Sequence, residues 1–321
     1  MRLERRDLVL GLAACAAAPP IRAAAGSSAP GPRIVATGLR FPEGPLVDAD
    51  GATILCEIEA GRITRVAPDG TKRVVAEPGG GPNGLAFGPD GALFCTNNGG
   101  FSWVEAQGRL FPTGRAAGWR TGRIERIDPA TGAVKVLYES YEGRPLSAPN
   151  DLVLDGRGGF WFSDSGGVTE TGREHGAIYY GRLDGSRLVR AVHHMILPNG
   201  IALSPDGATL YVATTFERQL LAFDVVGEGK LGPSPDPAVP GRVVVSFPGR
   251  DYLDSIRVQA NGDICLTVLV AEEIRVVSPR GRIVRRIPAP DRIPTSLGFG
   301  GAAMRSARIT LGTTGRLMAL D

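Results

Sequence analysis

The 321-residue sequence predicts an all-β protein: a six-bladed β-propeller with a divalent-cation site at its centre. Three observations predict this class. The chain is rich in turn-forming residues, with 45 glycines and 25 prolines, and has few stretches of helical periodicity. One pattern recurs at intervals of about 40 to 67 residues, a period typical of propeller blades. In five copies, that pattern begins with an amide or carboxylate side chain.

The repeated pattern is a polar residue, about four to six mostly apolar residues, a D-G or N-G type of turn, and a second apolar run. It is clear in "PNDLVLDGRGGFWFSDSGG", residues 149–167, and in "LPNGIALSPDGATLYVATT", residues 197–215. A degenerate sixth copy begins near Ser296. The five regular copies begin at Glu43, Asn83, Asn150, Asn199 and Asp254.

Each copy is predicted to form four short strands. In the second copy the strands are "GLAFG", "ALFCTN", "GRIERIDP" and "AVKVLYES"; the fourth copy has "GIALS", "TLYVAT", "QLLAFDV" and a poorer outer strand. The sixth copy ends one strand short, at "GRLMALD", while "RIVATGLRF" precedes the first copy. We predict that this N-terminal strand completes the last blade, because ring closure removes two open sheet edges.

Two segments depart from the pattern. Residues 101–121 carry Gly, Arg and aromatic residues and lie between the second and third predicted strands of the second blade. We expect this insertion to form a lid over one face. Residues 226–242 are rich in Pro and Gly and are interpreted as a connector without function.

The N-terminus has the features of an export signal. Arg5 and Arg6 precede a short apolar stretch, and "AAAG" offers a cleavage site before Gly26. We predict a signal peptide over residues 1–25, of twin-arginine type, and a propeller domain over 26–321 in the periplasm. Lipid anchoring through Cys15 in "LAAC" and a purely cytoplasmic protein are the alternatives.

Composition excludes several classes of function. The formal charge is only +3 and the Lys and Arg residues are scattered, so no nucleic-acid surface is expected. No segment is long enough to span a membrane, and we expect a monomer that binds a small-molecule substrate. Cys56, Cys95 and Cys265 lie in predicted strands without metal-site spacing and are interpreted as buried apolar residues.

The five polar positions define what we call the axial ring: Glu43, Asn83, Asn150, Asn199 and Asp254. The inner strands of a propeller line its central channel, so equivalent positions meet around one axis. Two carboxylates with amide oxygens suit a hard cation that takes about six to eight oxygen ligands. We predict calcium there, with magnesium, manganese and zinc as alternatives, because buried paired carboxylates are costly without a cation.

Turn chemistry offers an alternative for each position taken alone, because Asn and Asp before a strand often bond their own backbone. Asp90, Asp206 and Asn261, further along their repeats, are predicted to be such turn formers. Asp164 ends a predicted strand and is interpreted as a turn cap or as a contact behind the site. The cation hypothesis depends on the shared register and on Glu43, a poor turn former.

Four motifs, in this order, carry a family resemblance: "FPEGP", "APNDLVLD", "LPNGIALSPDGATLYVAT" and "LDSIRVQANGDICLT". Together they resemble the family of gluconolactonase, regucalcin (senescence marker protein) and luciferin-regenerating enzyme, over residues 34–321. The resemblance implies a six-bladed propeller with one divalent cation, usually calcium, in its channel. It also implies metal-assisted hydrolysis of a lactone or related ester.

The resemblance assigns roles to the axial ring. It implies that Glu43, Asn199 and Asp254 are metal ligands, and that Asp254 is also the catalytic base or nucleophile. Asn150 falls where relatives place either a fourth metal ligand or a substrate-facing asparagine, and Asn83 is assigned to substrate or water contact. Sugar-lactone members carry an Arg two positions before the Asn150 equivalent. In this chain that position is Ala148, so the resemblance does not extend to an aldonolactone substrate.

Three functions remain open at this point. A metal-dependent lactonase or esterase is the leading hypothesis, a phosphotriesterase could use the same cation, and a non-catalytic propeller could bind a small molecule or a protein. Retention of the acidic Asp254 favours an enzyme. Ser-His-Asp catalysis is not indicated, because there is no G-x-S-x-G motif and the only histidines are His175, His193 and His194. Of these, His194 could approach the site, although a packed or exposed strand histidine is the simpler interpretation.

Overall fold

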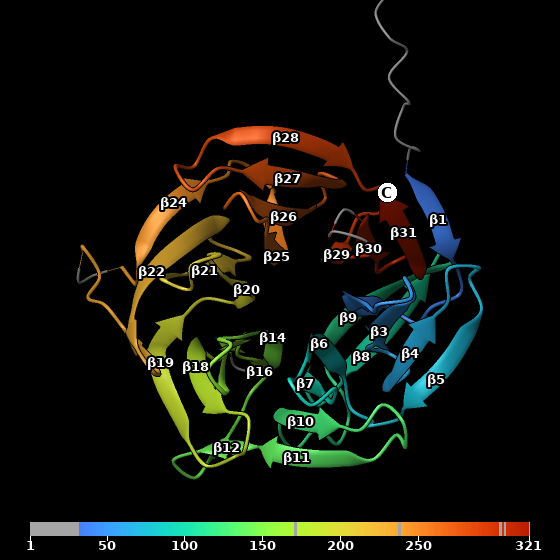
Figure 1. The fold of residues 1–321 in the computed structure, drawn as a ribbon, viewed down its shortest axis with the longest axis horizontal. Helices are drawn as coiled ribbons and strands as arrows, with labels where there is room; N and C mark the ends of the chain where they lie inside the picture. Colours follow the sequence, from blue (N-terminus) through green and yellow to red (C-terminus); the bar gives the residue numbers. More distant parts are fainter. Residues whose placement is uncertain (1–31, 170–171, 237–238, 302–303, 305, 321) are drawn as a thin grey trace, which may run out of the picture.

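The computed structural model describes residues 32–320 except 170–171, 237–238, 302–303 and 305. The predicted signal peptide, including Cys15, lies outside the described residues. Six antiparallel sheets surround a central axis, and the chain runs once around the ring (Figure 1). The predicted six-bladed propeller is therefore confirmed. No helix of the described part is long and apolar enough to cross a membrane.

The first three blades are regular four-stranded sheets in which the chain runs from the innermost strand outward. Blade 1 has β2 (Pro42–Val47), β3 (Thr53–Glu57), β4 (Arg62–Val66) and β5 (Lys72–Ala76). Blade 2 has β6 (Pro82–Phe87), β7 (Leu93–Asn97), β10 (Arg123–Ile127) and β11 (Val134–Tyr138). Blade 3 has β14 (Pro149–Leu154), β15 (Gly159–Asp164), β18 (Gly176–Arg182) and β19 (Leu188–Met195).

The last three blades follow the same plan. Blade 4 has β20 (Pro198–Leu203), β21 (Thr209–Thr214), β22 (Gln219–Gly227) and β24 (Arg242–Ser246), with the short β23 (Lys230–Leu231) also paired to β22. Blade 5 has β25 (Tyr252–Val258), β26 (Ile264–Leu269), β27 (Glu273–Val277) and β28 (Ile283–Pro288). Blade 6 has β29 (Pro294–Gly300), β30 (Ser306–Leu311), β31 (Arg316–Leu320) and β1 (Arg33–Ala36).

The N-terminal strand closes the ring. β1 pairs antiparallel with β31, with Arg33 opposite Ala319, so the first and last described strands share blade 6 (Figure 1). This confirms the predicted closure. The predicted turn formers Asp90, Asp206 and Asn261 each accept a backbone N–H from two residues further along the chain, as tight turns with a following glycine require.

The core is divided among the contacts between neighbouring blades. Each of six apolar clusters joins the facing sheets of two adjacent blades, including blades 6 and 1. Cys56 and Cys95 pack between blades 1 and 2, and Cys265 packs between blades 5 and 6; all three are buried and free. Their interpretation as apolar core residues is confirmed.

Among the described residues, three hairpins form small two-stranded sheets of their own. They are β8 (Phe101–Ala106) with β9 (Arg109–Arg115), β12 (Ser140–Tyr141) with β13 (Arg144–Pro145), and β16 (Val168–Thr169) with β17 (Gly172–Arg173). We call the first of these the mouth hairpin. It lies between β7 and β10, the second and third strands of blade 2, where the sequence predicted an insertion.

Candidate functional site

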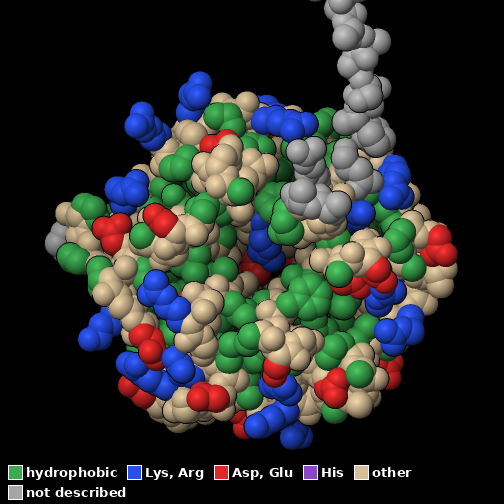
Figure 2. All heavy atoms as spheres, in the orientation of Figure 1, with side chains coloured by type: hydrophobic (Ala, Val, Ile, Leu, Met, Phe, Trp, Pro, Cys, Tyr) green, Lys and Arg blue, Asp and Glu red, His purple; other side chains and the backbone are tan. Residues whose placement is uncertain are grey.

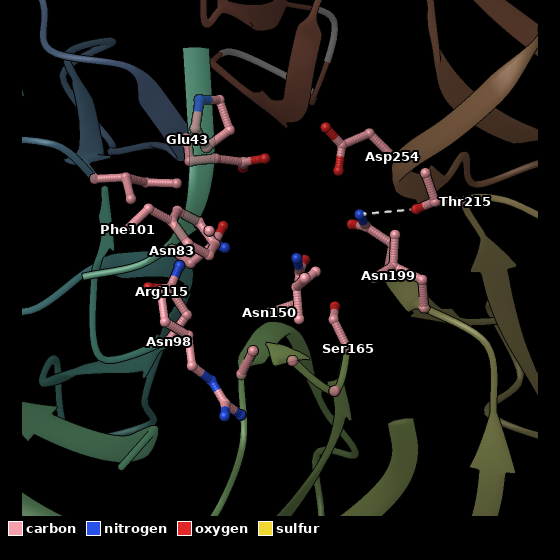
Figure 3. Close-up of a pocket in the computed structure, with 18 of the residues that line it drawn as sticks. Glu43, Asn83, Asn98, Phe101, Arg115, Asn150, Ser165, Asn199, Thr215 and Asp254 are labelled. Carbon is pink, nitrogen blue, oxygen red and sulfur yellow. Dashed lines mark hydrogen bonds between the residues drawn. The ribbon is translucent and has the colours of Figure 1, made fainter. Parts of the chain in front are cut away.

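The inner strands bring the axial ring together at the centre of the molecule. All five predicted residues line one pocket, one from each of β2, β6, β14, β20 and β25 (Figure 3). All except Asn150 are buried, and Asn150 is half-buried. The sixth blade contributes Thr295 of β29 to the same pocket, one residue before the Ser296 at which the sequence placed the sixth copy. The shared register therefore identified a real cluster of side chains.

A local irregularity is common to all six inner strands. In each strand the pairing register with the next strand shifts at the ring position. Such a bulge bends a strand and re-aims a side chain. In blades 1, 2 and 4, glycine follows the ring residue. A Cβ atom on Gly44 would lie 2.3 Å from the Asn83 carbonyl oxygen, and one on Gly200 would lie 2.4 Å from the Ile256 nitrogen. The P-x-G motif thus reflects the close approach of neighbouring inner strands.

In blades 2 and 3, the segments that lead into the ring are held by the polar residue at the end of the second strand. Asp164 of β15 accepts backbone N–H bonds from Ser147 at 2.8 Å, Ala148 at 2.7 Å and Gly166 at 3.0 Å. Asn97 does the same for Gly81 at 2.9 Å. The turn-cap interpretation of Asp164 is confirmed, and this cap positions the backbone just before Asn150.

Hydroxyl groups link the ring from blade to blade. Thr96 donates to the carbonyl oxygen of Asn150, Ser163 donates to that of Asn199, and Thr267 donates to that of Thr295. Thr295 in turn donates to the Pro42 carbonyl oxygen at 2.7 Å. The hydroxyl groups of one blade thus satisfy the backbone carbonyl groups of the next. The side chains of the ring residues are not needed for these bonds and can bind a ligand in the pocket.

The asparagine oxygens of the ring lack protein partners. The Oδ1 atoms of Asn83, Asn150 and Asn199 are buried and have no hydrogen-bond donor among the described residues. The Asn199 amide is oriented by Nδ2, which donates to the Thr215 hydroxyl at 3.2 Å (Figure 3). Buried acceptors without partners are costly, so three of them around one pocket indicate a missing ligand with electropositive character.

The pKa values of both ring carboxylates, Glu43 and Asp254, are raised. Burial raises the pKa of Asp254 to about 8; the Asn199 amide opposes this rise and the Asp151 carboxylate adds to it. Burial, and then the Asp254 and Asp151 carboxylates, raise the pKa of Glu43 well above its usual range. A bound cation would reverse both shifts. The donor set therefore fits a hard divalent cation through amide and carboxylate oxygens together; among the described residues, no three His, Cys, Asp or Glu side chains are arranged to hold a metal ion by themselves.

A buried ion pair inside the ring was not predicted from the sequence. Arg257 Nη1 lies 2.7 Å from Asp151 Oδ2, and both side chains are largely shielded from solvent. Acidic and basic atoms are visible inside the central hollow (Figure 2). Glu43 interacts electrostatically with Asp254, Asp151 and Arg257, so these three carboxylates and one guanidinium, when ionised, carry two more negative than positive charges. This balance matches a divalent cation. The signal in the sequence was Asp151 in "PND", where two other copies have "PNG".

A second set of lining residues was also missed. These residues lie at the end of the second strand of their blades or directly after it, so the same repeat register could have found them: Ile58, Asn98, Ser165, Thr215 and Leu269. Asn98, Ser165 and Thr215 add polar groups beside the ring (Figure 3). The histidines do not contribute, because His175, His193 and His194 are exposed, contact one another and do not line the pocket.

The mouth hairpin covers part of the pocket, as expected of the insertion. Phe101, Pro112, Gly114 and Arg115 line the pocket wall. The Leu110 N–H donates to the Thr313 carbonyl oxygen at 3.0 Å, which ties the hairpin to blade 6. On the other side, Arg115 pairs with Glu174 and donates to the Ser147 hydroxyl at 2.6 Å. The hairpin is thus anchored on both sides of the pocket.

Comparison with known proteins agrees with this architecture. Residues 41–313 match the family model described as the SMP-30/Gluconolactonase/LRE-like region. The chain belongs to this family. The matched region contains the whole axial ring and all six inner strands, so the family resemblance inferred from four motifs is confirmed.

Individual relatives of this SMP-30/gluconolactonase/LRE-like protein are distant. A gluconolactonase of Zymomonas mobilis is 27% identical over 207 residues, 57% of this chain and 51% of the relative. The chain thus spans about half the length of that protein. Lactonase drp35 of Staphylococcus haemolyticus is 24% identical over 253 residues, 78% of this chain and 70% of the relative. A crystal structure of regucalcin, a calcium-binding protein from Agrobacterium tumefaciens, superimposes with a TM-score of 0.69 at 18% identity, covering 91% and 93% of the two chains.

Proposed function

We propose that this protein is a divalent-cation-dependent hydrolase of lactones or related esters. The observation that carries the proposal is the convergence of three unpartnered asparagine oxygens and two buried carboxylates on one pocket. The names of the relatives, gluconolactonase and lactonase, support lactones as the substrate class. The calcium-binding neighbour regucalcin supports a divalent cation.

Glu43, Asn150, Asn199 and Asp254 would hold the cation. All four offer oxygen donors, which calcium prefers; magnesium, manganese and zinc are the other candidates. The excess of two negative charges among the central side chains favours a divalent ion over a monovalent one. When bound, the cation supplies Lewis-acid polarisation of the lactone carbonyl.

The chain's own residues position the reactants. Asn83 lies in the ring beside the proposed ligands and would orient the substrate. Asp254 either takes a proton from the attacking water on a carboxylate oxygen or attacks the carbonyl carbon itself. In both routes the ring C–O bond breaks and the leaving oxygen gains a proton. Attack by water gives the hydroxy acid directly, whereas attack by Asp254 gives an anhydride that a water molecule must then hydrolyse to release the hydroxy acid and restore the carboxylate. Because a ligated carboxylate is a weak base, close positioning must supply much of the rate.

Metal analysis combined with a substrate panel tests this proposal. The mature protein is purified, assayed for bound divalent ions, and offered lactones, aryl esters and organophosphates, and the set is repeated with Asp254→Asn. We expect one ion per chain, lactone turnover, and a loss of about a thousandfold or more in kcat for the variant. Asp206→Asn, an exposed turn residue in blade 4, is the matched control.

Each part of the proposal can fail separately. If no divalent ion co-purifies or rebinds, the cation site is refuted. Ion binding without turnover would indicate the non-catalytic binding propeller, and turnover of organophosphates alone would indicate a phosphotriesterase. Full activity in Asp254→Asn would remove that residue from the chemistry while leaving the site itself in place.

A further inference from the structure

The pocket changes character between its floor and its mouth. The floor is the polar axial ring. Toward the opening, where Arg173 is also exposed, half-exposed or exposed apolar side chains gather: Phe101, Pro112, Val168, Leu197, Leu269 and Ile293. Hydrophobic side chains border the central hollow in the space-filling view (Figure 2). These six apolar side chains come from the mouth hairpin, from blades 3 and 5, and from the connections that precede blades 4 and 6. Exposed apolar patches of this kind mark binding sites.

Two of the apolar residues in the pocket wall adopt an unfavourable backbone conformation. Phe41 has φ +55° and Leu197 has φ +48°, each directly before the proline that precedes a ring residue. The left-handed region is sterically poor for residues with a Cβ atom, and such outliers cluster at ligand sites. Neither position is filled by glycine or asparagine, the residues that this conformation favours. The fold therefore keeps two large apolar side chains in the pocket wall at a conformational cost.

The charged residue that the mouth hairpin contributes to the pocket is held by neighbouring residues, although its Nε atom is buried without a hydrogen-bond partner among the described residues. Arg115 is its one charged residue in the described lining of the pocket, and it pairs with Glu174, bonds Ser147 and stacks on Trp119 at 3.8 Å. On the opposite side, the Trp103 ring packs on Phe41 with the centroids 4.9 Å apart. The hairpin thus presents the apolar side chains of Phe101 and Pro112 to the pocket and holds them in fixed positions.

We infer that the preferred substrate is a neutral lactone carrying an alkyl or aryl substituent, with its carbonyl at the axial ring and its hydrocarbon group at the mouth. This inference rests on the proposed function and names the substrate class of that same site. The pocket volume of about 270 Å³ admits a small lactone ring with a short substituent. A polyhydroxylated lactone would bring several hydroxyl groups against these apolar side chains. The unpartnered donors Asn98 Nδ2 and Arg115 Nε can serve few of them, so most would lose water without gaining partners.

A series of lactones that differ only in chain length tests the inference. We would measure kcat/KM in calcium for unsubstituted δ-valerolactone, for 6-alkyl-δ-valerolactones of increasing length, and for glucono-δ-lactone. Each buried methylene should raise kcat/KM by about threefold until the mouth is filled, and glucono-δ-lactone should be the poorest substrate. A kcat/KM that stays constant or falls with increasing alkyl length would overturn the inference. A higher kcat/KM for glucono-δ-lactone than for the alkyl lactones would do the same.

Matched variants locate the effect at the mouth. Val168→Ser should reduce the gain per methylene, so that kcat/KM for the longest alkyl lactone falls about two- to threefold relative to δ-valerolactone. Val136→Ser is the control, because Val136 is similarly exposed (43%, against 50% for Val168) but lies on the outer strand β11. An equal effect of both variants on the ratio would contradict a role for the mouth.

Binding of unreactive analogues separates this inference from the proposed chemistry. The affinity of 6-alkyl-δ-valerolactams is measured by calorimetry on the calcium-loaded protein. If no lactone is hydrolysed but lactam affinity rises with alkyl length, the catalytic proposal is wrong, whereas binding of a hydrocarbon group at the mouth is supported. If lactones are hydrolysed but lactam affinity is independent of length, the proposed function stands and the substrate class is wrong.

Discussion

The Thr215 hydroxyl accepts a hydrogen bond from Asn199 Nδ2 at 3.2 Å, and this bond determines which end of the Asn199 amide is free. With Nδ2 engaged, the buried Oδ1 atom is left without a protein partner. Groups behind a metal ligand often fix its orientation in this way. Thr215 therefore positions a proposed ligand of the axial ring although it comes from the loop after β21.

The first prediction concerns this bond. Thr215→Val keeps the volume of the side chain but removes the acceptor, so the Asn199 amide can rotate. We expect calcium affinity to fall about tenfold, measured by calorimetric titration of the metal-free protein. Thr214→Val is the control, because its hydroxyl donates to the Gln219 carbonyl oxygen instead. Unchanged affinity in Thr215→Val would mean that Asn199 is held by other contacts.

The second prediction concerns the ion pair inside the ring. Arg257→Met leaves the Asp151 carboxylate buried without its partner, close to Glu43 and Asp254. Breaking a buried pair in this way should cost about 3–5 kcal/mol in the free energy of unfolding. The double variant Asp151→Asn/Arg257→Met removes both charges and should recover much of that loss. Urea unfolding of the metal-free proteins gives the four free energies of this cycle, and additive losses would show that the two residues act independently.

Much of the fold could be predicted because a propeller repeats one pattern. The spacing of the copies indicated six blades, the missing outer strand of the last copy indicated the closure by β1, and the common register brought the axial ring together. Each of these follows from position within a repeat. The pocket residues at the ends of the second strands, such as Ser165, also occupy equivalent positions in their repeats. They could have been predicted in the same way.

The remaining parts of the site depend on contacts between blades that no single repeat encodes. Asp151 and Arg257 come from blades 3 and 5 and pair only because both inner strands reach the axis. The anchoring of the mouth hairpin by Thr313 likewise joins segments about two hundred residues apart. The sixth position was placed at Ser296 instead of Thr295 because that copy has no amide or carboxylate to mark the register.

The third prediction concerns the glycine after Asn83. A Cβ atom on Gly84 would lie 2.8 Å from both the Asn150 carbonyl oxygen and the Asp151 Cα atom. Gly84→Ala should therefore separate blades 2 and 3, costing about 1–3 kcal/mol in stability and lowering calcium affinity through Asn150. Gly227→Ala is the control, since its nearest neighbours would be 3.9 Å away and its backbone is not left-handed. Thermal unfolding with and without calcium compares the two variants.

The last prediction concerns pH. Burial raises the pKa of Asp254 to about 8 in the metal-free protein, against an ordinary value of 3.8. A carboxyl group with a raised folded-state pKa contributes stability that is complete below its unfolded pKa and is lost as pH rises through the folded value. The Tm of the metal-free protein should therefore decrease as the pH rises from about 4 to about 8.

Calcium should oppose that loss, because a bound cation favours the ionised carboxylate and its binding displaces the proton. The difference in Tm between calcium-loaded and chelator-treated protein is expected to grow as pH rises through the same window. Asp254→Asn, which cannot ionise, should flatten the pH dependence of the metal-free Tm. A difference that stays constant with pH in the unaltered protein would show that Asp254 does not give up a proton to the cation.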